Sequence, residues 1–231
     1  MISKGLFISP ALTVHGLSWC KDEPKTVGIE ALTKKILCET HNSGLSPVDS
    51  GGGAAFGILR EQTKLAHDRR NLVYSTLLKV ERFHIDAKLL ERWFLKTLLN
   101  LTCESEFLIG ESGTEPGVAP ADLVKICYGL GKFSGEAGMY VAVNIGMSLT
   151  MEDTVKFSPL LTADHKRVMG GFFEFRGIRF FLDLSSVGFK LPLNSIAGLD
   201  PAWANAQLNR PFTKMRAKHG RFMSHIVEFH W

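Results

Sequence analysis

The chain has 231 residues, of which 45% are hydrophobic and 22% are charged, a composition that favours a globular protein with a buried core. Its formal net charge of +4 and its isoelectric point near 8.9 permit contact with a polyanion such as DNA but do not require it. The apolar runs are shorter than the ~20 residues of a membrane helix, and residues 1–10 lack the apolar core of a signal peptide, so we expect a cytoplasmic protein with no membrane partner.

A first helix is predicted to begin at Ser46, a favoured N-cap residue that is followed by a proline and by Asp49 in the first turn. The pattern runs to about residue 67. Each glycine at positions 51–53 costs up to about 1 kcal/mol relative to alanine, so we expect the regular helix to settle only after Ala54.

A strand over residues 77–85 and a second helix are predicted next. Asp86 is the expected N-cap of this helix, and large apolar residues recur at helical spacing around Trp93, which indicates a core helix. Arg92 and Lys96 lie four residues apart and are expected to form its solvated edge.

The C-terminal half is predicted to contain a short helix over residues 121–128 and then mostly strands. The strands are expected at residues 139–145, 155–161, 171–175, 178–184 and 225–231, with a hairpin turn at Arg176-Gly177. The economical architecture is a mostly antiparallel sheet packed on the helix that carries Trp93, which makes the fold α+β.

Two basic segments are candidates for contact with nucleic-acid phosphates. The first is Arg60, Lys64 and His67, which share a face of the first helix, with Arg69-Arg70 after it; a solvated basic face is the commoner reading of such a pattern. The second lies between Phe212 and Phe222 and consists of Lys214, Arg216, Lys218 and Arg221. It either tracks a nucleic-acid backbone or is a loop whose phenylalanines anchor it to the core.

Three ionisable residues near the C-terminus invite a metal-site interpretation. If residues 225–231 form a strand, His225 lies on one face, whereas Glu228 and His230 lie on the other. The three side chains are therefore not expected to converge on one ion.

Cys38 and His41 have the C-x2-H spacing of a zinc knuckle, in which a thiolate and an imidazole converge on one tetrahedral ion. Such a pair arises by chance in about one chain in seven of this composition, and a closed zinc site needs four ligands. The spacing alone is therefore a weak indication of zinc.

The surrounding sequence LTKKILCETHNSGLSPVD resembles the distal motif of HNH-endonuclease-like, treble-clef proteins of bacteria. The opening MISKGLF is similar to the stretch that follows the catalytic (Asp/Glu)-His pair in that family. The resemblance implies that Cys38 and His41 are the second pair of structural zinc ligands. It places Asn42 near a catalytic divalent metal, and it implies that the helix after the motif approaches DNA.

The same resemblance implies metal-dependent hydrolysis of DNA by the complete protein. The catalytic acid–histidine pair and the first C-x2-C have no counterpart in this sequence, so we expect a chain truncated at its start and inactive as it stands. Residues 1–70 would form the partial HNH-like segment with its helix, and residues 71–231 an α+β domain.

The alternative interpretation is a non-catalytic binding or scaffold protein with a vestigial knuckle. Bound zinc that is lost on replacement of Cys38 and His41 would favour the first interpretation. No small-molecule cofactor is predicted, and the oligomeric state is left open.

Overall fold

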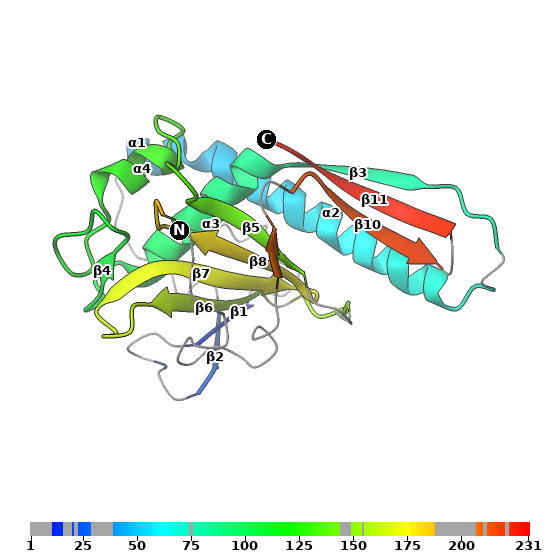
Figure 1. Cartoon of the computed structure of the whole chain (residues 1–231), viewed down its shortest axis with the longest axis horizontal. Coiled ribbons are helices and arrows are strands. Elements are labelled where there is room, and N and C mark those ends of the chain that lie inside the picture. The colour runs from blue at the N-terminus through cyan, green and yellow to red at the C-terminus, as the bar shows by residue number, and fades with distance from the viewer. Residues whose placement is uncertain are drawn as a thin grey trace.

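The computed structural model describes residues 11–15, 20, 23–28, 39–73, 76–143, 149–153, 155–187, 207–209, 212–219 and 222–231. Within these ranges, helices pack against two mixed, mostly antiparallel sheets, so the predicted α+β class is confirmed (Figure 1). The expected treble-clef segment is described only in part, and Cys38 lies outside these ranges. None of the described helices is long and apolar enough to cross a membrane.

The larger sheet is hydrogen-bonded in the order β2-β1-β6-β7-β8-β5-β9, and β4 pairs with β7 beside this path. The pairs β1–β6 and β4–β7 are parallel, and the remaining pairs are antiparallel. Arg176 and Gly177 form the predicted turn between β7 and β8, and both have the positive φ that a primed hairpin turn requires. The strands are β1 (Ala11–Val14), β2 (Lys25–Gly28), β4 (Leu108–Ile109), β5 (Gly138–Val143), β6 (Val155–Leu161), β7 (Arg167–Phe175), β8 (Ile178–Asp183) and β9 (Gln207–Asn209).

Four described helices accompany the sheets: α1 (Glu39–Gly44), α2 (Ser46–Arg70), α3 (Ala87–Thr102) and α4 (Ala121–Cys127). The predicted helix behind Asp86 is confirmed, and the carboxylate of Asp86 accepts a hydrogen bond of 2.9 Å from the backbone N–H of Leu89. On α3, Phe94 stacks on Phe173 of β7 with a centroid separation of 4.3 Å. The core helix therefore lies on the larger sheet, as predicted.

The glycines near the start of α2 do not delay the helix, so the expectation that it settles only after Ala54 is wrong. A Cβ atom on Gly51 would lie 2.5 Å from Cβ of Leu89, and one on Gly52 would collide with the indole of Trp93. The two glycines let α2 approach α3 closely. The packing gained there offsets their low helix propensity.

The expectation that Lys96 lies on a solvated edge is also wrong. Only 4% of its side chain is exposed, and its Nζ donates to both carboxylate oxygens of Asp49 at 2.6 Å. Asp49 belongs to the first turn of α2, so this ion pair joins α2 to α3 beneath the surface.

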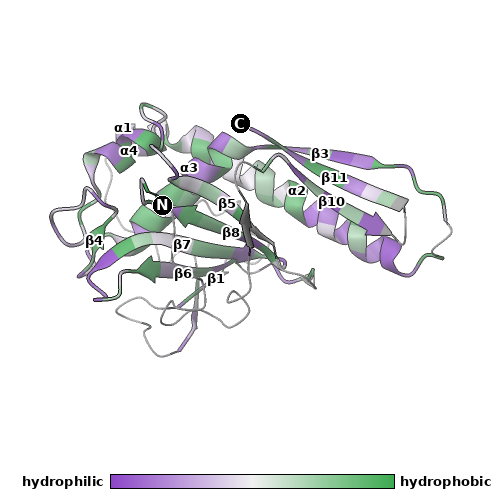
Figure 2. Cartoon of the chain, in the orientation of Figure 1, coloured by the Kyte–Doolittle hydropathy of each residue, from purple (hydrophilic) through white to green (hydrophobic). Residues whose placement is uncertain are grey.

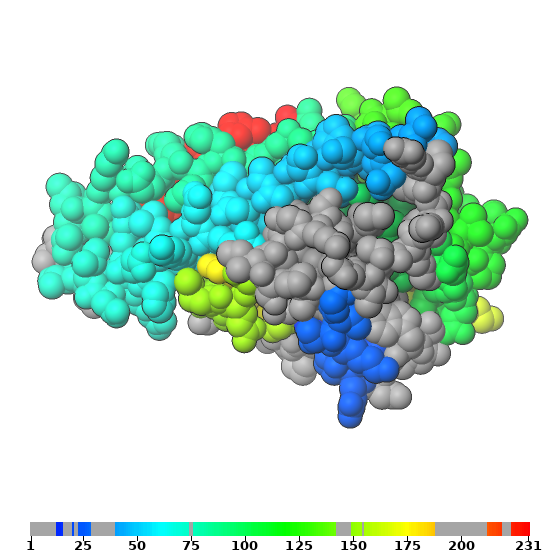
Figure 3. Space-filling view, turned by 180° about the vertical axis from the view of Figure 1, so that it is seen from behind, coloured from blue at the N-terminus to red at the C-terminus, as the bar shows by residue number. Residues whose placement is uncertain are grey.

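A three-stranded sheet extends from the larger sheet together with the C-terminal part of α2. Its order is β10 (Lys214–His219), β11 (Phe222–His230) and β3 (Glu81–Asp86), and β3 pairs with β11 in parallel. We call this unit the arm. It projects beyond the larger sheet (Figure 1), and it carries more hydrophilic residues than the strands of that sheet do (Figure 2). Seen from behind, α2 runs from the arm towards the end of the molecule that carries α4 (Figure 3).

Candidate nucleic-acid interface

The two faces of the three-stranded sheet differ sharply in exposure. Val227 and Phe229 of β11 and Ile85 of β3 are buried on the face that α2 covers. The alternate residues of each strand are mostly exposed on the opposite face, which we call the outer face. The outer face is thus an open surface on which side chains from three strands lie next to one another.

The C-terminal basic segment is a strand and not the loop that the sequence suggested. Lys214, Arg216 and Lys218 occupy alternate positions of β10, and all three are exposed on the outer face. Because successive side chains of a strand point to opposite faces, this spacing of two residues places the three positive charges on the same face. Phe212 is buried before the strand, which agrees with the core-anchoring alternative for this residue, and Arg221 lies outside the described residues.

The strand register adds further polar residues to the outer face. Glu228 of β11 lies opposite Lys214 on one side and opposite His84 of β3 on the other. In the same way, Ile226 is flanked by Arg216 and Arg82, and it is only 8% exposed. The alkyl stems of long basic side chains readily cover an apolar residue in such a position.

Basic residues outnumber acidic ones on this face. Glu228 accepts hydrogen bonds from Arg82 at 2.9 Å and from Lys214 at 3.2 Å, and Lys214 in particular holds the pKa of Glu228 below its usual range. Arg216 and Lys218 form no ion pair with any residue that the structure describes. Their charges are therefore available to an external anion.

Three outer-face residues form a compact group that we call the His–Glu–His cluster. Nδ1 of His84 lies 3.0 Å from Nε2 of His230 and 3.3 Å from Oε2 of Glu228. The sequence correctly placed Glu228 and His230 on one face, but it did not identify His84. His84 is 146 positions away from His230, and it becomes their neighbour only through the parallel pairing of β3 with β11.

His225 has a structural role behind the outer face. It is buried, and Nε2 of its ring lies 3.0 Å from the side-chain oxygen of Gln62 on α2. Burial, assisted by the charge of Arg69, lowers the pKa of His225 to about 4. The ring is therefore neutral at pH 7 and joins β11 to α2, and it does not approach Glu228 and His230.

Arg60 and Lys64 of α2 lie away from the outer face. Arg60 donates to Asp153 at 3.1 Å, and its guanidinium lies 5.7 Å from the ring centroid of Phe175, so it already has partners within the fold. Lys64 is exposed on α2, which covers the opposite face of the three-stranded sheet. The structure does not bring either residue together with Lys214, Arg216 and Lys218.

The HNH-like motif is described only in part. His41 and Asn42 belong to α1, whereas Cys38 lies outside the described residues. The backbone oxygen of His41 accepts a hydrogen bond of 2.9 Å from the hydroxyl of Tyr128, which follows α4, and the His41 side chain is exposed.

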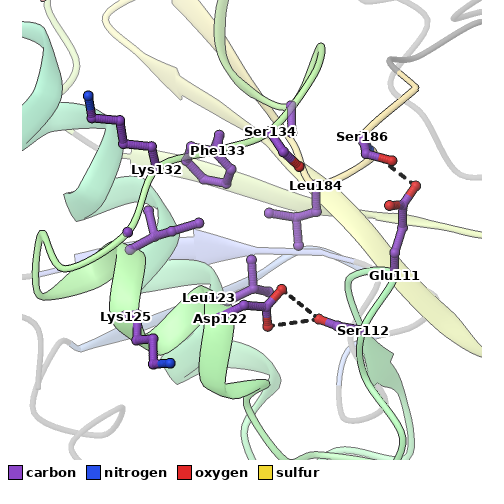
Figure 4. Close-up of a pocket in the computed structure, with 13 residues that line it drawn as sticks. Glu111, Ser112, Asp122, Leu123, Lys125, Lys132, Phe133, Ser134, Leu184 and Ser186 are labelled. Atoms are coloured by element: carbon purple, nitrogen blue, oxygen red, sulfur yellow. Dashed lines mark hydrogen bonds between the residues drawn. The ribbon is translucent and has the colours of Figure 1, made fainter.

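A pocket of about 280 Å³ lies between α4 and the end of β8 (Figure 4). The carboxylates that line it are already hydrogen-bonded, since Asp122 accepts from Ser112 at 2.8 Å and Glu111 accepts from the backbone of Ser186 at 3.1 Å. Both carboxylates already have partners within the fold, whereas Arg216 and Lys218 on the outer face have no described ion-pair partner, so the outer face is the stronger candidate.

Comparisons with known proteins do not add a family: no family model matches the chain, and no curated protein or solved structure matches it. The functional assignment therefore depends on the residues themselves.

Proposed function

We propose that this chain binds DNA through the outer face of its three-stranded sheet, as the DNA-binding part of an HNH-endonuclease-like protein. The observation that carries the proposal is the row of Lys214, Arg216 and Lys218 on β10, joined by Arg82 across the sheet. Arginine and lysine side chains neutralise phosphate charges and donate hydrogen bonds to phosphate oxygens. The balance favours an anion, because Glu228 and Asp86 are the only carboxylates at the described outward positions, and Asp86 caps α3.

The shape of the face favours duplex DNA over a single strand. The basic strand β10 lies at the edge of the sheet in an antiparallel pair with β11, and the major groove admits a two-stranded β-ribbon of this kind. Proteins that hold unpaired bases use aromatic side chains as stacking platforms. Among the outward side chains that the structure describes on β3, β10 and β11, none is Phe, Tyr or Trp.

The test compares two double variants that change the net charge equally. Arg216→Glu/Lys218→Glu reverses the two outer-face charges that have no described ion-pair partner, so the fold should be retained. Lys125→Glu/Lys132→Glu reverses two exposed charges on or near α4, at the end of the molecule far from the arm (Figure 1). Binding of a fluorescein-labelled duplex is measured by anisotropy over a series of salt concentrations.

The outer-face variant should bind the duplex at least tenfold more weakly, and its salt dependence should fall by about 2 in the slope of log K against log [salt], at roughly 0.9 per lost phosphate contact. The α4 variant should keep the wild-type slope. Equal weakening in both variants would mean that only net charge matters, and that result overturns the assignment of the outer face. A Lys64→Glu/Arg70→Glu variant tests the α2 side, and a selective loss there would place DNA on the helix instead.

Metal-dependent hydrolysis of DNA is proposed only on the resemblance of the N-terminal motif, with Cys38 and His41 as zinc ligands and Asn42 near a divalent metal. The exposed His41 side chain on α1 is compatible with a ligand role. Plasmid nicking in the presence of Mg²⁺ or Mn²⁺ tests this part separately. Because the catalytic (Asp/Glu)-His pair of the resembled family has no counterpart in this sequence, we expect DNA binding without cleavage, and nicking by the wild-type chain would contradict this expectation. The scaffold interpretation is favoured if the folded chain binds neither zinc nor DNA.

A further inference from the structure

We propose that His84, Glu228 and His230 form a binding site for a divalent transition-metal ion of the Zn²⁺ class. The site is distinct from the Cys38–His41 pair, and it does not depend on whether the outer face binds DNA. The inference rests on the geometry of the three side chains and on the chemistry of their ligand atoms.

The ligand atoms are already close to the separations that one metal ion requires. All three atoms lie within 4.8 Å of one another, and the two distances from Nδ1 of His84 are 3.0 and 3.3 Å. A tetrahedral ion with bonds of about 2.0–2.2 Å holds its ligands about 3.3 Å apart. Both histidines are exposed at the sheet surface, so small rotations of their rings suffice to admit the ion.

The backbone holds the three residues in this arrangement before any ion binds. His84 and Glu228 are direct neighbours in the parallel register of β3 and β11, and His230 follows on the same face two residues after Glu228. The pairing of the strands fixes the α-carbons. The buried side chains of Val227 and Phe229, on either side of Glu228 in the sequence, anchor β11 in the core. A site on paired strands loses little conformational entropy when the ion binds.

The donor set selects the class of metal. Two imidazole nitrogens and one carboxylate oxygen suit Zn²⁺, Co²⁺, Ni²⁺ or Cu²⁺, whereas Mg²⁺ and Ca²⁺ prefer oxygen ligands throughout. Three protein ligands leave one position open for water or for another donor, which is the pattern of a reactive or exchangeable site rather than of a closed structural one.

The charges around Glu228 tune the affinity of the site. Arg82 and Lys214 both bind Oε1 of Glu228, which leaves Oε2 directed at His84. These contacts orient the carboxylate as partners of metal ligands commonly do, but their positive charges oppose a second cation nearby. Removal of Lys214 should therefore strengthen metal binding. If the three residues only held the strands together, no such effect on metal binding would be expected.

The experiment is a calorimetric titration of the full chain with ZnCl₂, in a Cys38→Ser/His41→Ala background that removes the other expected ligands. We expect one Zn²⁺ per chain. His84→Ala and His230→Ala should each weaken binding about tenfold or more, and Lys214→Gln should strengthen it several-fold. His67→Ala is the matched control, because His67 is an exposed histidine on α2, and it should bind as the background does.

Absence of binding in the folded background chain would overturn the proposal, as would binding that persists unchanged in both His84→Ala and His230→Ala. Replacement of Zn²⁺ by Co²⁺ gives a second readout, since ligation by the cluster should produce a visible absorption band that the His84→Ala variant lacks. Loss of DNA binding with zinc binding retained would refute the proposed function and leave the metal site standing.

Discussion

The buried ion pair between Lys96 and Asp49 gives the sharpest test of how α2 and α3 are held together. Its two 2.6 Å contacts join side chains that are 4% and 15% exposed. Removing one partner of a buried pair typically costs about 3–5 kcal/mol, because the remaining charge is left uncompensated in a poorly solvated place. Replacing both partners costs less, since the desolvation of both charges is then avoided.

The structure predicts an order for the single variants. Asp49→Asn leaves the ammonium of Lys96 almost wholly buried, and we expect the free energy of unfolding to fall by about 3–5 kcal/mol. Lys96→Met leaves the carboxylate of Asp49, which is partly exposed and lies in the first turn of α2, where the helix dipole stabilises a negative charge by about 0.3–1 kcal/mol. Its cost should therefore be about 1 kcal/mol lower.

The assay is urea unfolding followed by circular dichroism for the two single variants, the double variant and a control. Lys156→Met is the control, since Lys156 is 54% exposed where it pairs with Glu174 and should contribute about 0–1 kcal/mol. The double variant should be more stable than the sum of the single costs implies, by a coupling of about 2–3 kcal/mol. Single costs that simply add, or a neutral Asp49→Asn variant, would refute this account of the helix interface.

Three further predictions concern the core. Gly52→Ala should destabilise the fold by about 1–3 kcal/mol through collision with Trp93, whereas Gly57→Ala should be neutral or stabilising, because nothing lies within 4 Å of its new Cβ. Equal urea midpoints for the two variants would contradict the argument that Gly52 lets α2 approach α3. The pKa of His225 is lowered from 6.5 to about 4, so the stability that the neutral ring contributes is fully present above pH 6.5 and is lost as the pH falls towards 4. A His225→Asn variant should therefore unfold at a lower urea concentration than the wild type at pH 7.5, and the difference between the two midpoints should be smaller at pH 5. A difference that stays the same at both pH values would argue against this role. Burial raises the pKa of Cys127 to about 12, so iodoacetamide at pH 8 should label Cys103 before Cys127 in the native protein, as peptide mass spectrometry would show; early labelling of Cys127 would mean that α4 opens readily.

Local sequence signals were sufficient where neighbours along the chain determine the structure. The Asp86 cap, the helical spacing around Trp93 and the turn at Arg176-Gly177 depend on backbone geometry within a few residues, and each is confirmed. The same reasoning failed at Lys96 and at the α2 glycines. Their burial and packing depend on how α2 packs against α3, and the spacing of residues within one helix does not reveal how that helix contacts another.

The sequence predicted the features of the outer face that lie within single segments, but not how the strands pair to form it. Alternation within residues 225–231 correctly separated His225 from Glu228 and His230, and the basic residues of β10 were identified as a segment although not as a strand. A strand over residues 77–85 was predicted and is present as β3, but its parallel pairing with β11, which brings Arg82 and His84 to the outer face from the other half of the chain, was not predicted. Strand register between distant segments is a tertiary property, so the His–Glu–His cluster could not be read from spacing.

The two proposals about the outer face are linked through Glu228, and the linkage can itself be measured. Glu228 is shared by Lys214 and Arg82 on one oxygen and by His84 on the other. A phosphate that engages Lys214 offsets the positive charge that opposes the metal, and a bound dication makes the face more attractive to phosphate. By thermodynamic reciprocity, Zn²⁺ must then raise DNA affinity by the factor by which DNA raises Zn²⁺ affinity. In the Cys38→Ser/His41→Ala background the duplex should bind more tightly with Zn²⁺ than without it, and the difference should disappear in His84→Ala. A zinc effect that survives this substitution would place the coupling elsewhere in the molecule.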